Sequence, residues 1–595
     1  MKIWLKEKIG SPELFTGRKQ ELSYFLDWID RIKQEISQST ALLSRRKTGK
    51  SALLQRLYNI TFHKNDVVIP FYYEIKETDQ WIGDFSTEFF LTFVYQYIAF
   101  KTRNREYLIY SKDNIDRALK TAQKEKLKWL INLIEDVQVS IKNRSFDYLW
   151  ETVRDAPRML VQFNDERMVQ FIDEFQFINR CIFRDQACKD RISNLAGSYL
   201  HTCEYKNAPL LVSGSWVGWL MDDLSKMLPG RFVRYPMLNL PEEESIEMIY
   251  KYSLIEKIPV SEETVYLIAN LTEGNPFYIS ALFRSRYPEK DLTSSEGVRK
   301  TLEFETLNID ANINTTWMEY IDSAFSRIND VYAKDIVMYL AKNRHRFVSR
   351  KELKQKLNLS MTDTELEKKF RALYKSDIIE EHYGRYRGVQ DNIFDKVFTR
   401  SYSDDVDKYV TEEAPNEYKA LFEKMQKKYQ VRSGEYSRYK GAFAEFMIWH
   451  HLKNNAFHNS DFFKSMLNNL PDDFSFAEYD RILSYHSPPL HEPEFQIDVF
   501  ARAKDTDYSL IGEVKNRKAK FSIKEAHAFL EKAGELIKLE KISKTVLFVF
   551  SVSGFHKNTF ALLKKHKIAW TDDRRWLKDN IIVCSEQTLK KNSEK

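Results

Sequence analysis

A stretch with the composition of a phosphate-binding loop lies near residue 50. The apolar run Ala41–Leu43 leads into Ser-Arg-Arg-Lys-Thr-Gly-Lys-Ser at 44–51, and a helical pattern follows. In such a strand–loop–helix turn, backbone N–H groups and the positive end of the helix bind phosphate oxygens. Lys50 would reach the β- and γ-phosphates of ATP, and the Ser51 hydroxyl would bind Mg²⁺. The residues expected to hold the nucleotide here are Lys47, Thr48, Gly49, Lys50, Ser51 and Ala52.

The first position of this loop departs from the usual pattern. Ser44 stands where G-x-x-x-x-G-K-[ST] has its first glycine. Glycine tolerates positive φ and a close backbone approach, whereas serine serves only if the backbone there stays in an allowed region. A chance Gly-Lys-Ser at the start of a basic helix is therefore the alternative interpretation.

Two adjacent acids complete the expected nucleotide site. The apolar run 167–172 ends in Asp173 and Glu174. Asp173 would orient the Mg²⁺ shell, and Glu174 would polarise the attacking water as a catalytic residue. An isolated Asp-Glu pair commonly caps a helix, but this pair follows a buried strand downstream of the Gly-Lys-Ser loop. A later strand pattern ends in Ser213 and Ser215, either of which would sense phosphate or form only a turn.

A second group of chemically active residues lies near the C-terminal end. Asp498 is at the centre of one strand pattern, and Glu513 and Lys515 lie two residues apart in the next. Because side chains alternate along a strand, Glu513 and Lys515 share a face, and Asp498 on the paired strand can join them. The carboxylates would hold Mg²⁺, which lowers the pKa of a water, and the lysine would position that water or stabilise charge on a phosphodiester. An exposed hairpin with a Glu–Lys pair and a capping acid is the alternative.

The elements that position these residues follow from apolar periodicity. Strands are expected at 41–43, 67–73, 167–175 and 209–215, with a long helical stretch at 85–153. The middle of the chain shows helices at 333–342, from 348 and at 362–376, and a hairpin around Gly384. Near the C-terminal end, the pattern is helix (441–446), strands (495–500 and 509–515), helix (522–539) and strand (545–552).

The first half of the sequence resembles the archaeal-type ATPases of the STAND group of P-loop NTPases. The motifs that carry the resemblance, within residues 12–330, are FTGRKQEL, SRRKTGKS, FIDEFQ, LLVSGS, LPGRF and GNPFYI. The resemblance implies that GNPFYI, with Pro276 near the start of a helix, touches the nucleotide base and reports occupancy. Arg231 and Arg234 flank the boundary between sheet and lid. Either is a candidate for an arginine on the γ-phosphate, and a solvated or structural cation is the alternative.

The middle and C-terminal parts have resemblances of their own. Residues 331–400 resemble a winged helix-turn-helix, which either binds DNA or serves as a rigid spacer. The C-terminal constellation resembles the PD-(D/E)xK nuclease superfamily, with Asp498 as the first acid and Glu513 and Lys515 as the ExK element. Glu445 matches the superfamily's upstream helical glutamate and would join Asp498 and Glu513 as a metal ligand for Mg²⁺ or Mn²⁺.

These features predict an α/β protein with several domains. We expect a P-loop NTPase domain with a parallel sheet and helices at 1–237, a helical lid at 238–330, a winged helix at 331–400, a helical linker at 401–431 and a PD-(D/E)xK, restriction-endonuclease-like α/β domain at 432–595.

Composition narrows the class of protein. The chain of 595 residues has a net charge of +6, and residues 432–595 contain 27 Lys and Arg against 22 Asp and Glu, or +5. This excess fits a nucleic-acid partner, with DNA favoured over RNA. The chain has no long apolar run and no signal peptide, and the spacing of its four cysteines is not typical of metal ligands, so we expect a cytoplasmic protein without a membrane span.

The leading hypothesis is a STAND-type ATPase whose nucleotide state regulates a metal-dependent nuclease, in defence against foreign nucleic acid. The alternative is an ATP-dependent scaffold that binds nucleic acid or a protein partner without cutting. A DNA motor is less favoured, because the sequence shows no translocase motif beyond the phosphate loop. Both main hypotheses are compatible with a homo-oligomer.

Overall fold

The computed structural model describes residues 3–112, 114–214, 217–328, 332–402, 433–488, 491, 493–504, 506–517 and 519–578. The chain divides into two compact units. The first comprises residues 1–244, 272–281 and 304–412, and the second comprises 245–271, 282–303 and 413–595. Ser215 and nearly all of the predicted linker at 401–431 lie outside the described residues.

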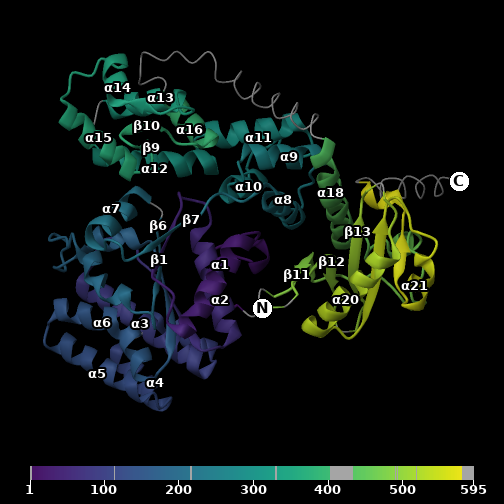
Figure 1. The fold of residues 1–595 in the computed structure, drawn as a ribbon, viewed down its shortest axis with the longest axis horizontal. Helices are drawn as coiled ribbons and strands as arrows, with labels where there is room; N and C mark the ends of the chain where they lie inside the picture. The colour runs from purple at the N-terminus through teal and green to yellow at the C-terminus, as the bar shows by residue number, and fades with distance from the viewer. Residues whose placement is uncertain are drawn as a thin grey trace. The chain divides into compact units, whose positions relative to one another are not determined.

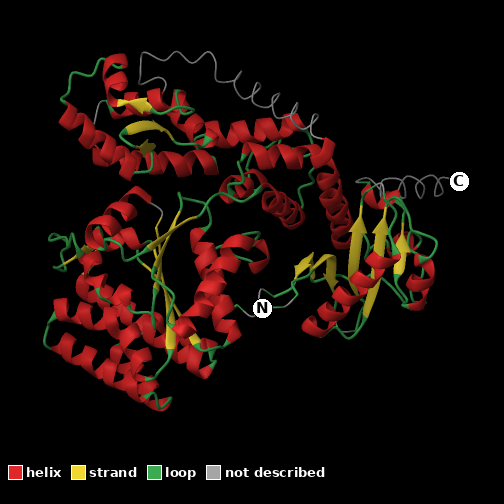
Figure 2. Ribbon diagram, in the orientation of Figure 1, coloured by secondary structure: helices red, strands yellow, loops and turns green. Residues whose placement is uncertain are grey.

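A five-stranded parallel sheet is the centre of the first unit (Figure 1, Figure 2). Its strand order is β2–β4–β6–β1–β7, and all four neighbouring pairs are parallel. The strands are β1 (Thr40–Leu43), β2 (Val68–Glu74), β4 (Arg167–Asp173), β6 (Leu210–Gly214) and β7 (Val233–Pro236). All but β7 are buried along most of their length, as expected of parallel strands covered on both faces. The predicted parallel sheet with helices is confirmed.

Helices cover both faces of this sheet. Helices α1 (Lys19–Asp30) and α2 (Lys50–Lys64) lie on one side, and α3 (Ile82–Thr102) and α6 (Phe146–Phe163) lie on the other (Figure 1). The predicted helical stretch 85–153 is interrupted, because α4 (Ile115–Lys124) and α5 (Lys128–Lys142) stand between α3 and α6. Helix α7 (Val217–Met227) connects β6 to β7.

Residues 312–402 form a small helical module with a three-stranded antiparallel sheet of order β8–β10–β9. Its elements are α12 (Asn312–Ile328), α13 (Ala333–Lys342), β8 (Val348–Ser349), α14 (Arg350–Lys356), α15 (Asp363–Lys375), β9 (Ile379–His382), β10 (Arg385–Gly388) and α16 (Asn392–Tyr402). Two caps fix the helix starts, since Ser349 accepts a hydrogen bond from Glu352 N and Thr362 forms a capping box with Glu365. The predicted helices and the hairpin turn at Gly384 (φ 73°) are confirmed.

The predicted lid segment, 238–330, is shared between the two units. It contains α8 (Glu242–Glu256), α9 (Glu262–Leu271), α10 (Pro276–Phe283) and α11 (Ser295–Leu307) before α12. The division between the units passes through α8, α10 and α11. These helices therefore do not form a body of their own.

The C-terminal part of the second unit is built on a mixed five-stranded sheet. Its order is β11–β12–β13–β14–β15, antiparallel up to β13 and parallel from there. The elements are α18 (Ser433–Asn454), α19 (Ser460–Lys464), β11 (Arg481–His486), β12 (Gln496–Arg502), β13 (Ser509–Lys515), α20 (Ile523–Glu540), β14 (Thr545–Ser551), α21 (Thr559–Lys565) and β15 (Ala569–Thr571). Apolar side chains of the sheet and α20, including Ile497, Ile511 and Phe529, form the core. Among the helices that the structure describes, none is long and apolar enough to cross a bilayer.

Gly17 provides a test of how the first unit is held together. Gly17 has φ 66°, and an added Cβ would collide with the carboxylate of Glu244 and lie 2.7 Å from its Cβ. Gly17→Ala is expected to lower the free energy of unfolding by about 2–4 kcal/mol, from backbone strain plus overpacking. Gly10→Ala is the matched control, because Gly10 also has positive φ (93°) but no atom lies within 4 Å of the added Cβ. Urea unfolding that shows equal losses for both variants would contradict the packing argument.

Candidate functional site

The phosphate loop connects β1 to α2 and lies at the carboxyl ends of the parallel strands. Two of its residues have left-handed backbone, Lys47 (φ 64°) and Gly49 (φ 95°), whereas Ser44 does not. Ser44 Oγ instead donates to Thr48 Oγ1 at 2.7 Å, and Thr48 Oγ1 donates to Arg45 O at 2.9 Å. The missing glycine is thus accommodated, because position 44 requires no positive φ and its hydroxyl braces the loop.

Lys50 is folded back onto this loop. Its Nζ donates to Ser44 O at 2.8 Å and to Arg45 O at 2.6 Å. Burial lowers the pKa of Lys50 to about 8, although the nearby carboxylates of Glu174 and Asp173 favour its charged form. Incoming phosphates would take the place of the two carbonyls. Ser51 and Ala52 follow in the first turn of α2, next to the Gly49 N-cap.

The two acids at the end of β4 have different surroundings. Asp173 is fully buried and accepts hydrogen bonds from the hydroxyls of Ser213 and Tyr72 and from Glu174 N. Glu174 is more accessible, and Gln176 Nε2 donates to its Oε2 at 2.5 Å. The structure therefore places an oriented acid and a second, more accessible acid close to Lys50.

Sequence reasoning missed two residues that organise this site. Tyr72 lies in β2, which pairs with β4, and its hydroxyl reaches Asp173 at 3.1 Å. Arg18 is buried and donates to Thr48 O at 2.7 Å and to Leu238 O at 2.6 Å. The Gly-Arg of the FTGRKQEL motif was the available indication for Arg18. No sequence pattern indicated Tyr72, because its contact with Asp173 depends on β2 lying next to β4 in the sheet.

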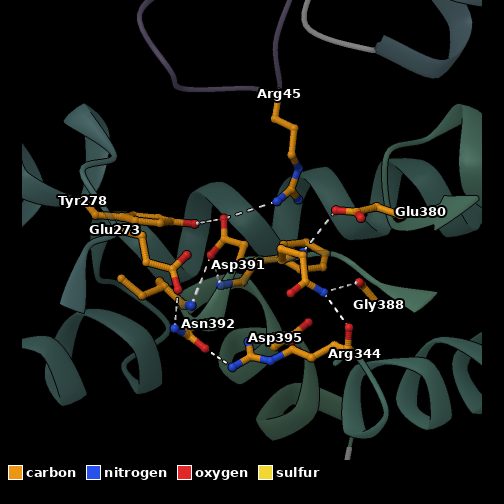
Figure 3. Close-up of polar contacts among 12 residues, drawn as sticks. Arg45, Glu273, Tyr278, Arg344, Glu380, Gly388, Asp391, Asn392 and Asp395 are labelled. Carbon is orange, nitrogen blue, oxygen red and sulfur yellow. Dashed lines mark hydrogen bonds and ion pairs between the residues drawn. The ribbon is translucent and has the colours of Figure 1, made fainter. Parts of the chain in front are cut away.

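The basic residues of the loop contact side chains from distant parts of the first unit, and Figure 3 shows this for Arg45. Arg45 Nη1 lies 3.4 Å from Asp391 Oδ2, which also accepts a hydrogen bond of 2.8 Å from Tyr278. Burial opposes the charge of Arg45, but Asp391, together with Tyr278, Tyr320 and Asp377, outweighs it and raises the pKa of Arg45. The guanidinium also lies over the rings of Trp317 and Phe394, at 5.8 and 5.4 Å.

The neighbouring cations make similar contacts. Arg46 lies over the ring of Tyr320 at 4.9 Å, and Lys47 lies over Phe277 at 5.1 Å. Phe277 is next to Pro276, which begins α10 as predicted. Together with Arg45, these contacts join the phosphate loop to α10, α12 and α16, and we call this set the loop clamp.

Acidic groups beside the clamp are strongly affected by burial. Burial and the charge of Asp391 raise the pKa of Glu273 to about 7. Burial raises the pKa of Asp395 to about 8, although Arg344, 3.0 Å away, favours its charged form. Figure 3 shows these side chains gathered around Asp391 and Asn392.

The two candidate arginines do not reach the phosphate loop. Arg231 precedes β7, at the amino end of the strand, and pairs with Glu204 at 2.6 Å. Arg234 is exposed and donates to Ser225 at 3.2 Å. Because β1 and β7 are parallel, the start of β7 lies at the sheet edge opposite to the loop. The structure therefore gives Arg231 and Arg234 the structural or solvated role that was the alternative.

The four C-terminal candidates come together at the junction of α18, β12 and β13. Lys515 Nζ lies 2.6 Å from Glu513 Oε1 and 3.4 Å from Asp498 Oδ2. Asp498 Oδ2 also accepts a hydrogen bond of 2.9 Å from Val514 N. Trp449 of α18 donates to Asp498 O at 3.0 Å, which fixes the helix that carries Glu445. We call Glu445, Asp498, Glu513 and Lys515 the carboxylate–lysine cluster.

Burial, and after it the repulsion between carboxylates, governs the electrostatics of this cluster. Burial, followed by the charge of Asp498, raises the pKa of Glu445 well above its ordinary value and also raises that of Glu513. Burial opposes the charge of Lys515, but Asp498 and Glu513 outweigh it and raise its pKa. At a pH between the pKa values that these groups have in the unfolded and in the folded protein, the folded protein binds more protons than the unfolded one. Its stability therefore falls as the pH rises through this range. A bound cation would stabilise the charged carboxylates and so oppose this loss of stability.

The donor set fits a hard divalent cation. Glu513 Oε2 is buried without a hydrogen-bond partner among the described residues, and oxygen ligands are those that Mg²⁺ and Mn²⁺ prefer. In the described part of the chain, no three His, Cys, Asp or Glu side chains are arranged as a ready-made metal site. Lys515 Nζ takes the position between the acids, so cation binding would require Glu513 and Lys515 to separate.

No family model matches the sequence, and no curated protein matches it significantly. Among solved structures, the chain is similar to the Walker-type ATPase PABY2304 of Pyrococcus abyssi, with 15% identity, 67% of this chain and 99% of that chain covered, and a TM-score of 0.45. The RuvB Holliday junction branch migration motor of Thermotoga maritima matches with 13% identity, 69% and 99% coverage and a TM-score of 0.31. The ORC2 protein of Aeropyrum pernix matches with 13% identity, 65% and 94% coverage and a TM-score of 0.35.

Proposed function

We propose that this chain is a P-loop ATPase of the STAND type whose nucleotide state regulates a metal-dependent nuclease of the PD-(D/E)xK type. The observation that carries the proposal is the carboxylate–lysine cluster, in which four residues chosen from the sequence meet where α18 packs on β12 and β13. The phosphate loop and its acids, in the same chain, supply the ATPase part of the proposal.

The nucleotide site has the groups that phosphoryl transfer needs. Lys50 would move from the loop carbonyls to the β- and γ-phosphates, and Ser51 and Asp173 would hold Mg²⁺ directly or through water. Glu174, the more accessible acid, would orient the attacking water. Tyr72 and Ser213 keep Asp173 in one orientation through their hydrogen bonds.

The carboxylate–lysine cluster has the groups that phosphodiester hydrolysis needs. Glu445, Asp498 and Glu513 would hold Mg²⁺ or Mn²⁺, which supplies a water of lowered pKa and neutralises phosphate charge. Lys515, released from Glu513, would stabilise the negative charge that develops on the phosphate during attack. DNA is the preferred substrate class in this proposal, and foreign nucleic acid is the expected biological target.

A cleavage assay tests this proposal. Purified full-length protein is incubated with Mg²⁺ or Mn²⁺, with and without ATP, and with single- and double-stranded DNA and RNA. We expect cutting of at least one substrate that requires the divalent cation and changes with ATP. If no substrate is cut under any nucleotide condition, but binding to nucleic acid or a protein persists, the non-cutting scaffold replaces the nuclease.

The loop clamp supports the regulatory part of the proposal. The module at 312–402, which we propose is a winged helix acting as a spacer, contacts the same loop that would bind phosphate. Asp391→Asn keeps the shape of the side chain but removes the charge that balances Arg45. We expect ATP to exchange several-fold faster in this variant, because a coupling of about 1–3 kcal/mol corresponds to 5–150-fold.

Asp310→Asn provides the control for this substitution, because Asp310 is an exposed acid on the loop before α12. Release of a fluorescent ATP analogue, followed by stopped flow, measures the exchange rate. Equal rates in wild type, Asp391→Asn and Asp310→Asn would show that the clamp does not restrain the nucleotide.

A further inference from the structure

Helix α8 belongs to both compact units, because their boundary falls between Glu244 and Ser245. Within the first unit, the carboxylate of Glu244 accepts hydrogen bonds from Arg18 N at 2.6 Å and Lys19 N at 3.1 Å. Arg18 in turn donates to Thr48 O of the phosphate loop. The buried residue Arg18 therefore links the first turn of α8 to the loop that would bind phosphate.

Within the second unit, the next turns of the same helix contact α18. The ring of Tyr250 stacks on Phe446, with centroids 4.7 Å apart and planes at 14°. Tyr250 is almost completely buried. Phe446 is adjacent to Glu445 in the chain, so the stack fixes the stretch of α18 from which the cluster glutamate projects.

Charges on α8 and α9 also act on α18. Glu247, which pairs with Lys251 at 3.0 Å, is close enough to Glu445 to oppose its ionisation. In α9, partial burial raises the pKa of Glu262, although Lys440 of α18 favours its charged form. The environment of Glu445 is therefore set in part by α8, and α9 acts on another residue of α18, Lys440.

We propose that α8 is the positioning element through which the nucleotide site controls the cluster, with Tyr250 holding Glu445 in place. This inference rests on the proposed nuclease function and names its route of regulation. A helix is stiff over the two turns from Glu244 to Tyr250. A change at Thr48 and Arg18 that moves the first turn of α8 would therefore move Tyr250 against Phe446.

The test compares cutting rates with and without ATP in Tyr250→Ala and Tyr250→Phe. We expect the ATP response of wild type, about fivefold or more, to disappear in Tyr250→Ala while the KM and kcat for ATP stay unchanged. Tyr250→Phe retains the stacked ring and is expected to restore the response. Tyr252→Ala is the matched control, because Tyr252 is a buried ring of the same helix that packs on Phe283 instead.

The outcomes separate this inference from the function on which it rests. If the wild-type protein cuts no substrate, the nuclease proposal is contradicted, and so is this inference, which rests on it. Wild type that cuts in response to ATP, with the same response in Tyr250→Ala, contradicts the role of α8 alone. Loss of the response in Tyr252→Ala as well would also overturn it, since general loosening of the helix would then explain both variants.

Discussion

Lys50→Ala is expected to abolish ATP turnover and to weaken ATP binding severely. Lys50 Nζ now satisfies two loop carbonyls and lies near Asp173 and Glu174, so its removal takes away both the phosphate ligand and the group that balances the acids. Loss of one such charge-stabilising donor reduces a rate by about 10²–10³-fold, or about 2.7–4 kcal/mol. Phosphate release and binding of a fluorescent ATP analogue measure the two effects.

Lys64→Ala is the control for Lys50→Ala, because Lys64 ends the same helix and, among the described residues, forms its ion pairs with the surface acids Asp30 and Asp66. It is expected to hydrolyse ATP at the wild-type rate. Hydrolysis by Lys50→Ala at the wild-type rate would show that the loop at 44–51 is not the nucleotide site.

Lys515→Ala and Asp498→Asn are expected to abolish cutting while ATP hydrolysis continues. Lys515 is the cation of the cluster that faces both Glu513 and Asp498, and Asp498 is held in place by Val514 N. Each substitution is expected to lower the single-turnover cutting rate by about 10²–10³-fold. Lys515→Ala also leaves three carboxylates without their counter-charge, so its stability without metal is expected to fall.

Asp473→Asn is the control for this pair, because Asp473 is an acid of the same unit that contacts only Tyr508 and Lys544 in the described structure. Its cutting rate is expected to equal that of wild type. Cutting that survives in both Lys515→Ala and Asp498→Asn would assign the activity to other residues.

The local parts of both sites could be predicted from the sequence. The period of two along a strand placed Glu513 and Lys515 on one face, and their contact of 2.6 Å confirms it. Likewise, the Asp-Glu pair after a buried strand was expected near Lys50, and the structure brings them together. In each case the chemistry depends on spacing within one strand or one loop.

Contacts that depend on the order of elements in space could not be predicted. Arg45 meets Asp391 across 346 positions of sequence, and no local pattern joins them. Arg231 was given a site role from its place in the chain, but the parallel pairing of β7 with β1 puts it at the other sheet edge. The edge strands β11 and β15 were missed, because β15 has only three residues and β11 shows no regular alternation of buried and exposed side chains.

Manganese binding to the nucleotide-free protein tests the carboxylate–lysine cluster most directly. Isothermal titration at pH 7.5 is carried out in two buffers of different ionisation enthalpy. Because the pKa values of Glu445 and Glu513 are raised, binding is expected to release protons and to weaken as pH falls. The cluster account predicts proton-linked binding that is at least about tenfold weaker in Glu513→Gln and Asp498→Asn and unchanged in Asp473→Asn. Binding of equal strength in all four proteins would contradict it.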